Sequence, residues 1–120
     1  MSFRFRQFPI YTEVRTFIKE VYTLSASLPK SEQFGLISQL QRASTSILLN
    51  IAEGSMRNSD AELNRFLLIS IGSVGEVVAI LDICLDNKYI SSSNHEQFVL
   101  KCESIAKQLY GFRRKLKQDK

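Results

Sequence analysis

Apolar residues recur at intervals of three and four along most of the chain, the spacing that places them on one face of an α-helix. The first run, residues 11–24, follows Pro9, which suits a first helical turn. It stops before Pro29, because the residue preceding a proline is disfavoured in the α conformation. A second run spans residues 37–51, and Ser31 is placed to cap its N-terminus. The pattern therefore predicts two helices joined by a short turn, the second fraying near residues 54–58.

Two segments of the capping-box type predict where the next helices begin. Ser59-Asp60-Ala61-Glu62 opens a third helix that reaches about residue 85, and Ser93-Asn94-His95-Glu96 opens a fourth after a turn at residues 86–88. The apolar positions of the fourth helix alternate in steps of four and three: Phe98, Cys102, Ile105, Leu109, Phe112 and Leu116. That alternation is a heptad seam, which we expect to pack against the other helices.

Four helices with short connections predict an all-α, antiparallel up-down-up-down four-helix bundle. At 120 residues, the chain has the length of one domain, so residues 1–120 are expected to form a single bundle. Residues 1–8 are an N-terminal arm in which Phe3, Phe5 and Phe8 partly alternate with Arg4 and Arg6, a run too short to indicate a strand. Residues 113–120 are a C-terminal tail.

The third helix is apolar on almost every side. No Lys or Arg occurs from residue 66 to residue 87, and no charge occurs from residue 43 to residue 52 of the second helix. Such helices are buried on more than one side, so we expect other copies of the chain to cover them in a homo-oligomer.

Glu76 and Asp82 argue against a membrane span, and the N-terminus lacks the apolar run of a secretory signal. A cytoplasmic protein without membrane contact is expected.

Polar residues share one face on each of the two central helices. If these helices form an antiparallel hairpin, facing residues have numbers that sum to a constant, and three candidate pairs share the sum 118. Arg42 then faces Glu76, Ser46 faces Gly72, and Glu53 faces Arg65, while Asn50 lies on the same face. Gly72 opposite Ser46 would let the helices approach closely. We interpret this polar ladder (Arg42, Ser46, Asn50, Glu53, Arg65, Gly72 and Glu76) as ion pairs that fix the register of the hairpin.

The sequence does not indicate an enzyme. A di-metal bundle site needs several Glu residues and Glu-x-x-His motifs, whereas the chain has one histidine, His95. We expect that side chain to be exposed, with no carboxylate placed to orient it. Cys84 and Cys102 lie in apolar surroundings and are expected to be buried free thiols. No Gly-rich phosphate loop is present, so we predict no catalytic residue, no metal and no cofactor.

The excess positive charge lies on the tail. The chain has a net charge of +4, and the last eight residues hold five basic side chains and one acidic one, so residues 1–112 are neutral on balance. We predict that these basic side chains bind phosphates of nucleic acid: Arg113, Arg114, Lys115, Lys117 and Lys120. Only Tyr110 and Phe112 could stack on bases there, so binding should be weakly sequence-specific. The alternative is a solvated tail that complements the dipole of the last helix.

Residues 34–81 resemble the family of four-helix-bundle proteins called 23S rRNA intervening-sequence proteins. The segment Asn50-Ile51-Ala52-Glu53-Gly54, followed about twenty residues later by Gly72-Ser73 and Glu76, is the most specific part of the resemblance. Further matching residues are Leu28-Pro29, Glu32, Gln39, Arg42, Ala43, Ser46, Arg57 and Phe66-Leu67.

The resemblance implies a left-handed antiparallel bundle that assembles as a homopentamer. The family is named for genes within insertions of bacterial 23S rRNA genes, which associates it with RNA. A more remote similarity is to the accessory variability protein of diversity-generating retroelements, a basic pentameric bundle that works with a reverse transcriptase and binds nucleic acid. Two functions stay open: weakly sequence-specific binding of RNA or DNA through basic termini, and an oligomeric scaffold for a protein partner such as a reverse transcriptase or ribosomal component.

Overall fold

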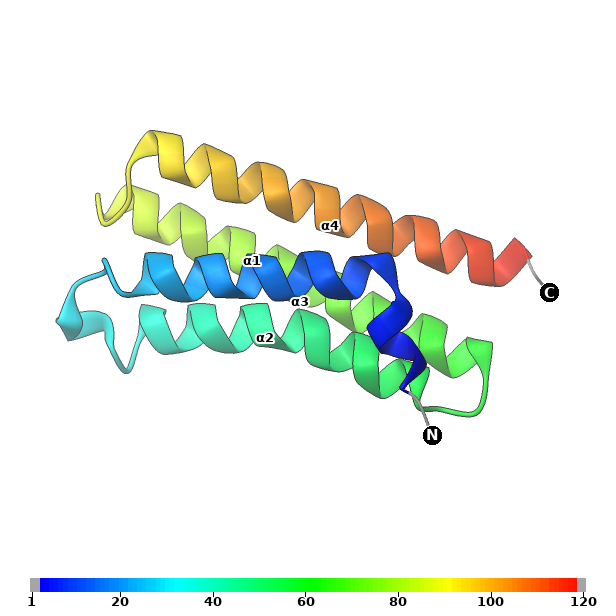
Figure 1. Cartoon of the computed structure of the whole chain (residues 1–120). Coiled ribbons are helices and arrows are strands. Elements are labelled where there is room, and N and C mark those ends of the chain that lie inside the picture. Colours follow the sequence, from blue (N-terminus) through cyan, green and yellow to red (C-terminus); the bar gives the residue numbers. More distant parts are fainter. Residues whose placement is uncertain (1–2, 119–120) are drawn as a thin grey trace.

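Six helical segments make up the computed structural model, which describes the backbone of residues 3–118 and the side chains of residues 3–117. They are the short 3-10 turn η1 (Arg4–Gln7), α1 (Pro9–Ser25), the 3-10 turn η2 (Lys30–Glu32), α2 (Leu36–Ser55), α3 (Asp60–Asp86) and α4 (Ser92–Gln118). The four α-helices pack in chain order, each antiparallel to the one before it (Figure 1). The predicted all-α four-helix bundle with up-down connections is therefore confirmed.

The core runs along the middle of the bundle and draws on all four helices. Its largest fully buried side chains include Phe17, Leu40, Ile47, Leu67 and Leu81. The predicted seam of α4 is confirmed, since its first four members are buried and its last two pack partly against the core: Phe98, Cys102, Ile105, Leu109, Phe112 and Leu116.

Both cysteines are buried free thiols, as expected. Burial raises the pKa of the Cys102 thiol to about 12 and that of Cys84 above its ordinary value. Because the thiolate is the reactive form of cysteine, neither side chain is suited to act as a nucleophile near neutral pH.

The start of α3 was predicted correctly, and the starts of α2 and α4 were not. The Ser59 hydroxyl accepts a hydrogen bond from the Glu62 backbone N–H (3.1 Å), so Ser59 caps α3. Helix α4 is instead capped by Ser91, whose hydroxyl accepts from the Asn94 backbone N–H (3.0 Å), two residues before the predicted Ser93. Ser91 directly follows the buried Ile90, so the helix starts as soon as the chain leaves the core.

Ser31 is not a helix cap. It lies inside η2, and α2 begins only at Leu36, whose backbone N–H donates to the Glu32 carboxylate (3.2 Å). The extra turn between Pro29 and Gly35 separates Ser31 from the helix that it was expected to cap. The free N–H group at the start of α2 is instead satisfied by the Glu32 carboxylate, which lies four residues before Leu36.

Replacing Ser59 with alanine should lower the free energy of unfolding by about 1 kcal/mol, because the first turn of α3 loses its side-chain acceptor. Urea unfolding followed by circular dichroism measures the change. Ser93→Ala is the matched control, since Ser93 is an exposed serine near a helix start that caps nothing in the structure, and it should change stability by a few tenths of a kcal/mol at most. Equal losses from both variants would contradict the assignment of the caps.

Serine side chains set the contact between α2 and α3, which is the most extensive in the bundle. The Ser46 and Ser73 hydroxyls are hydrogen-bonded (2.9 Å), and the buried Ser70 hydroxyl donates to the Ile47 carbonyl (2.9 Å). The residue numbers of these two pairs sum to 119 and 117, on either side of the predicted 118. The register of the hairpin was therefore predicted to within one residue. The Asn50 amide donates to the Ser46 carbonyl (2.8 Å) within the same face.

The ion pairs predicted across this hairpin are wrong. Glu53 pairs with Arg57, four residues further on and just past the end of α2 (2.9 Å), and Arg65 pairs with Glu62 one turn back along α3 (3.1 Å). Arg42 and Glu76 are both exposed, and no ion pair joins them in the described residues. These long, solvated side chains pair with residues three or four positions away in sequence, which need no contact between helices to meet.

The close approach between α2 and α3 occurs at Gly54, not at Gly72. A Cβ atom added to Gly54 would lie 2.6 Å from the Cβ of Phe66 and 3.1 Å from a methyl carbon of Leu63. Gly72 is exposed and has nothing within 4 Å of the equivalent position. The predicted contact between Gly72 and Ser46 is thus wrong, because Ser46 meets the adjacent Ser73.

An apolar stripe remains on the outside of α3. Apart from the charged Glu76, its exposed positions are aliphatic or small and follow one another at helical spacing: Leu68, Ile69, Gly72, Gly75, Ala79 and Ile83. Among the described residues, α3 is also the one helix long and apolar enough to cross a membrane. Core helices of soluble proteins meet the same criterion, so length and composition are weak evidence for a span. We call these six residues the outer stripe of α3.

Candidate nucleic-acid interface

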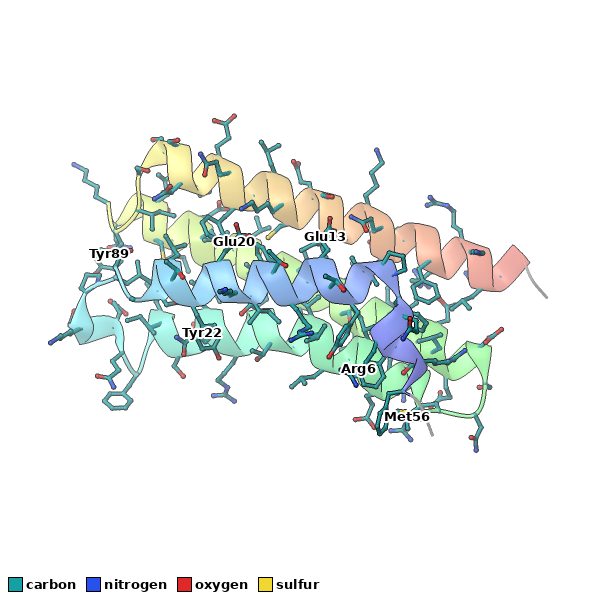
Figure 2. All side chains as sticks on the ribbon, viewed as in Figure 1. Arg6, Glu13, Glu20, Tyr22, Met56 and Tyr89 are labelled. Atoms are coloured by element: carbon teal, nitrogen blue, oxygen red, sulfur yellow. The ribbon has the colours of Figure 1, made fainter. Side chains whose placement is uncertain are left out.

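The two ends of the described chain meet at one end of the bundle. Phe8 and Phe112 pack edge to face with ring centroids 5.0 Å apart, which joins the start of α1 to the last turns of α4. The turn η1 lies against the end of α2, where the Arg4 guanidinium donates to the Ser55 carbonyl (3.3 Å). In Figure 2 Arg6 and Met56 lie at this end and Tyr89 at the opposite one. We call it the basic end, for the side chains described next.

The predicted tail residues continue α4 at the basic end. Arg113 is half-buried, and its guanidinium donates to the Asn64 side-chain oxygen of α3 (2.8 Å). Arg114, Lys115 and Lys117 are exposed. Lys120 lies outside the described residues. The structure therefore holds one of the five predicted side chains against α3 and leaves three facing solvent.

Arg4 and Arg6 add positive charge that the sequence did not assign to this site. Both are exposed, and in the described part of the chain no carboxylate lies within ion-pairing distance of either. The available signal was their alternation with aromatic residues in the arm. The alternation did not show where in the fold these arginines lie, because residues 3–8 reach α4 only through the tertiary packing of Phe8 on Phe112.

Acidic side chains near the α2–α3 turn do not neutralise these cations. Glu53 and Glu62 form their ion pairs with Arg57 and Arg65, and the hydrogen bond from Arg65 holds the pKa of Glu62 below its ordinary value. Asp60 lies in the first turn of α3, where a negative charge complements the helix dipole. The positive charge of the arm and tail therefore faces solvent with little local compensation.

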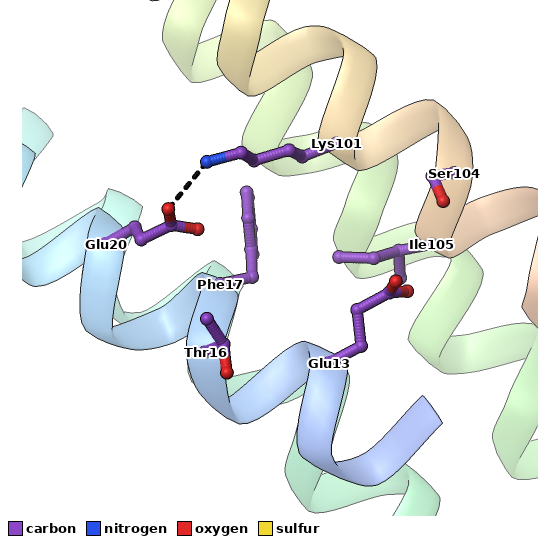
Figure 3. Close-up of a pocket in the computed structure, with 7 residues that line it drawn as sticks. All are labelled: Glu13, Thr16, Phe17, Glu20, Lys101, Ser104 and Ile105. Atoms are coloured by element: carbon purple, nitrogen blue, oxygen red, sulfur yellow. Dashed lines mark hydrogen bonds and ion pairs between the residues drawn. The ribbon is translucent and has the colours of Figure 1, made fainter. Parts of the chain in front are cut away.

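A cavity of about 350 Å³ lies elsewhere, between α1 and α4 (Figure 3). Its floor is formed by the buried Phe17 and Ile105. At its rim the Glu20 carboxylate pairs with the Lys101 ammonium (2.6 Å), and the Glu13 carboxylate accepts a hydrogen bond from Gln108. Because both carboxylates already have partners, this cavity is a loosely packed helix contact bridged by polar side chains, not a site with a free acid or base.

The environment of His95 differs from the prediction. Its ring nitrogen Nε2 lies 2.7 Å from a carboxylate oxygen of Asp82 on α3, and the side chain is half-buried. The expectation of an exposed histidine without an orienting carboxylate is therefore wrong. The two residues are 13 positions apart on opposite sides of the α3–α4 turn, so only the folded hairpin brings them together. Among the described residues, no three His, Cys, Asp or Glu side chains are grouped to hold a metal ion.

Comparison with known proteins assigns the chain to a family. Residues 6–111 match the family model described as 23S rRNA-intervening sequence protein. The chain belongs to this family. A solved structure of a protein with unknown function from the S23 ribosomal protein family, from Bacteroides thetaiotaomicron, has the same fold with a TM-score of 0.81 and 23% identity, over 88% of this chain and 95% of that chain. No curated protein matches the chain.

The residues by which this 23S rRNA-intervening sequence protein resembles its family lie mainly in the α2–α3 hairpin. Ser46, Asn50 and Ser73 belong to the hydrogen-bonded face between the two helices. Gly54 and Phe66 form the close approach near the turn. These five positions, which are all uncharged, build the contact between α2 and α3.

The basic end extends beyond the matched residues. Arg113, Arg114, Lys115 and Lys117 follow residue 111, and Arg4 precedes residue 6. Membership of the 23S rRNA-intervening sequence protein family therefore covers the four-helix bundle. It does not extend to these cations, whose role is argued from the structure of this chain.

Proposed function

We propose that this protein is a non-enzymatic, oligomeric helical bundle that binds RNA through its basic end with weak sequence specificity. The supporting observation is that Arg4 and Arg6 of the arm lie at the same end as Arg114, Lys115 and Lys117 of α4, without carboxylates in ion-pairing distance among the described residues. Lysine and arginine gain affinity for nucleic acid by releasing the counterions condensed on its phosphates. This gain depends on charge and not on base identity.

Self-association is the second part of the proposal. Leu68, Ile69 and Ile83 of the outer stripe of α3 are 48%, 41% and 44% exposed, and these side chains form a row with small residues and Glu76 between them. Monomers rarely expose a row of this kind, and a second copy of the chain would cover it. We propose a homo-oligomer, a pentamer as the family resemblance implies. Assembly would bring several basic ends onto one nucleic acid and raise its affinity through multivalency.

Neutralising the exposed cations of α4 tests the RNA-binding proposal. The triple variant Arg114→Gln, Lys115→Gln, Lys117→Gln should bind a labelled RNA more weakly than the natural chain. The slope of log affinity against log salt should become shallower by about 2, since each lost phosphate contact on a single strand removes about 0.7. Fluorescence anisotropy at several salt concentrations measures both quantities.

A second triple variant controls for net charge. Lys19→Gln, Lys30→Gln, Lys88→Gln removes the same three charges from exposed positions outside the basic end. It should leave the salt slope nearly unchanged. Equal losses from both triples would show that net charge and not the basic end drives binding, and the absence of RNA binding by the natural chain would reject the proposal.

One observation favours a second candidate function, a scaffold for a protein partner. Phe34, in the connection between α1 and α2, is 91% exposed, and buried aromatic anchors dominate many protein interfaces. A partner such as a reverse transcriptase or a ribosomal component would then bind at the end opposite the arm and tail. Under this alternative the natural chain does not bind RNA, so the titration above distinguishes the two functions.

A further inference from the structure

Three aromatic rings of the arm and of the first turn of α1 form a row outside the core. The centroids of Phe3 and Phe5 are 5.8 Å apart, and those of Phe5 and Tyr11 are 5.2 Å apart. Phe3 is 45% exposed, and Phe5 and Tyr11 are half-buried. We call these three residues the N-terminal aromatic row.

Folding of the bundle does not account for this row. Among the aromatic residues of this region, Phe8 packs against the core and against Phe112, and so attaches the arm to the bundle. Phe3, Phe5 and Tyr11 are not part of that packing and contact one another. Rings left partly exposed outside the core cost solubility, so a row of them at one end of a bundle indicates a binding surface.

One arginine lies over a ring of the row, and two more belong to the arm that carries Phe3 and Phe5. The Arg15 guanidinium lies over the Tyr11 ring, 5.6 Å from its centroid, and Arg4 lies 5.9 Å from the centroid of Phe8. Arg6 follows Phe5 in the arm and is exposed. No carboxylate of the described residues lies within ion-pairing distance of these three arginines. The surface therefore combines one exposed and two half-buried aromatic rings with positive charge.

We propose that the N-terminal aromatic row is a stacking platform for the bases of single-stranded nucleic acid. This inference rests on the proposed function and adds the strandedness of the ligand. Rings flanked by cations match the chemistry of an unpaired strand, whose bases stack on the rings while its phosphates contact the arginines. In a duplex the bases stack on one another, so only their edges and the phosphates are accessible. The platform thus selects single strands and tolerates any base.

The absence of tryptophan from the chain allows a direct test. The variant Phe3→Trp carries its only indole in the aromatic row, at an exposed position that accepts the larger ring. A ten-nucleotide single-stranded RNA of mixed sequence should quench its fluorescence, because a stacked base lies against the indole. The same sequence annealed to its complement should bind through phosphates without comparable quenching. Phe34→Trp is the matched control, since it places the indole at an exposed phenylalanine at the opposite end of the bundle, and neither RNA should quench it.

A second variant measures what stacking contributes to affinity. Phe3→Leu keeps an apolar side chain and removes the ring, so binding of the single strand should weaken about tenfold, within the range for loss of one base–aromatic stack. Binding of the duplex should stay within about twofold of the natural chain. Phe34→Leu should change neither.

The outcomes separate this inference from the proposed function. If the natural chain binds RNA with a steep salt dependence, but Phe3→Trp is not quenched and Phe3→Leu binds normally, the stacking platform is rejected and phosphate binding by the basic end stands. Equal affinity and equal quenching with single strands and duplexes would also reject it. If the natural chain binds neither form, both proposals fail.

Discussion

Replacing Gly54 with alanine should destabilise the protein by about 2 kcal/mol, the largest stability change we expect from adding a single methyl group. The new Cβ would lie 2.6 Å from the Phe66 Cβ, an atom fixed to the backbone of α3 that no rotamer change can move away. The helices would have to separate, and overpacking of this kind costs about 1–3 kcal/mol. Alanine favours a helix interior over glycine by about 1 kcal/mol, but Gly54 lies in the last turn of α2, where that gain is smaller.

Gly111→Ala is the matched control for this prediction. Gly111 lies inside α4, and an added Cβ there would meet only the end of the Arg114 side chain at 3.7 Å, an ordinary contact distance. This variant should gain about 0.5–1 kcal/mol from helix propensity alone. Urea midpoints at one fixed protein concentration measure both changes, since association shifts apparent stability. Stabilisation by both substitutions would show that α2 and α3 are not in close contact at Gly54.

The sequence was sufficient to predict the helices and the register of the central hairpin. Apolar spacing and the two prolines located α1 and α2, and the shared sum of the three facing pairs aligned α2 with α3 to within one residue, although the pairs themselves do not form as predicted. It was not sufficient to identify which residues make the contact. A one-residue offset places Ser73 and not Gly72 against Ser46, and helical periodicity does not resolve one residue.

The ion pairs across the hairpin were predicted wrongly for a different reason. Glu53 had a possible partner across the hairpin, Arg65, and another four residues away in sequence, Arg57, just past the end of α2. At an exposed position the local pair needs no particular helix packing, and it formed. The hydroxyl contacts of the buried or half-buried serines, in contrast, depend on the register and report it correctly.

Only the part of the candidate interface that is continuous in sequence, the basic tail, could be predicted. Five basic residues in the last eight are visible by counting, whereas the proximity of Arg4 and Arg6 to them depends on the packing of Phe8 against Phe112. The aromatic row likewise joins Phe3 and Phe5 to Tyr11 of α1. The alternation of aromatic and basic residues in the arm is too short for a strand. It is the only part of this surface that is visible in the sequence.

Replacing Ala79 with glutamate should convert the proposed oligomer to a monomer. Ala79 is exposed in the middle of the outer stripe of α3, and its helical neighbours Glu76 and Asp82 offer no positive partner for the new carboxylate. In an isolated bundle the side chain would extend into water at little cost. In an assembly it would be buried without a partner, which costs about 3–5 kcal/mol and raises the dissociation constant by a hundredfold or more. Mass photometry across a dilution series measures the shift.

Ala61→Glu makes the same substitution at another exposed alanine of α3, beside Asp60 and Glu62 in the first turn. The assembly should survive this change, because residue 61 precedes the outer stripe and a negative charge there complements the helix N-terminus. If Ala79→Glu assembles like the natural chain, another face holds the oligomer together. If it is monomeric and folded, its RNA affinity should fall as well, although every cation of the basic end is intact, because one basic end then acts without the others. Assembly and RNA binding are thus tested by a variant that alters no cation or ring of the proposed interface.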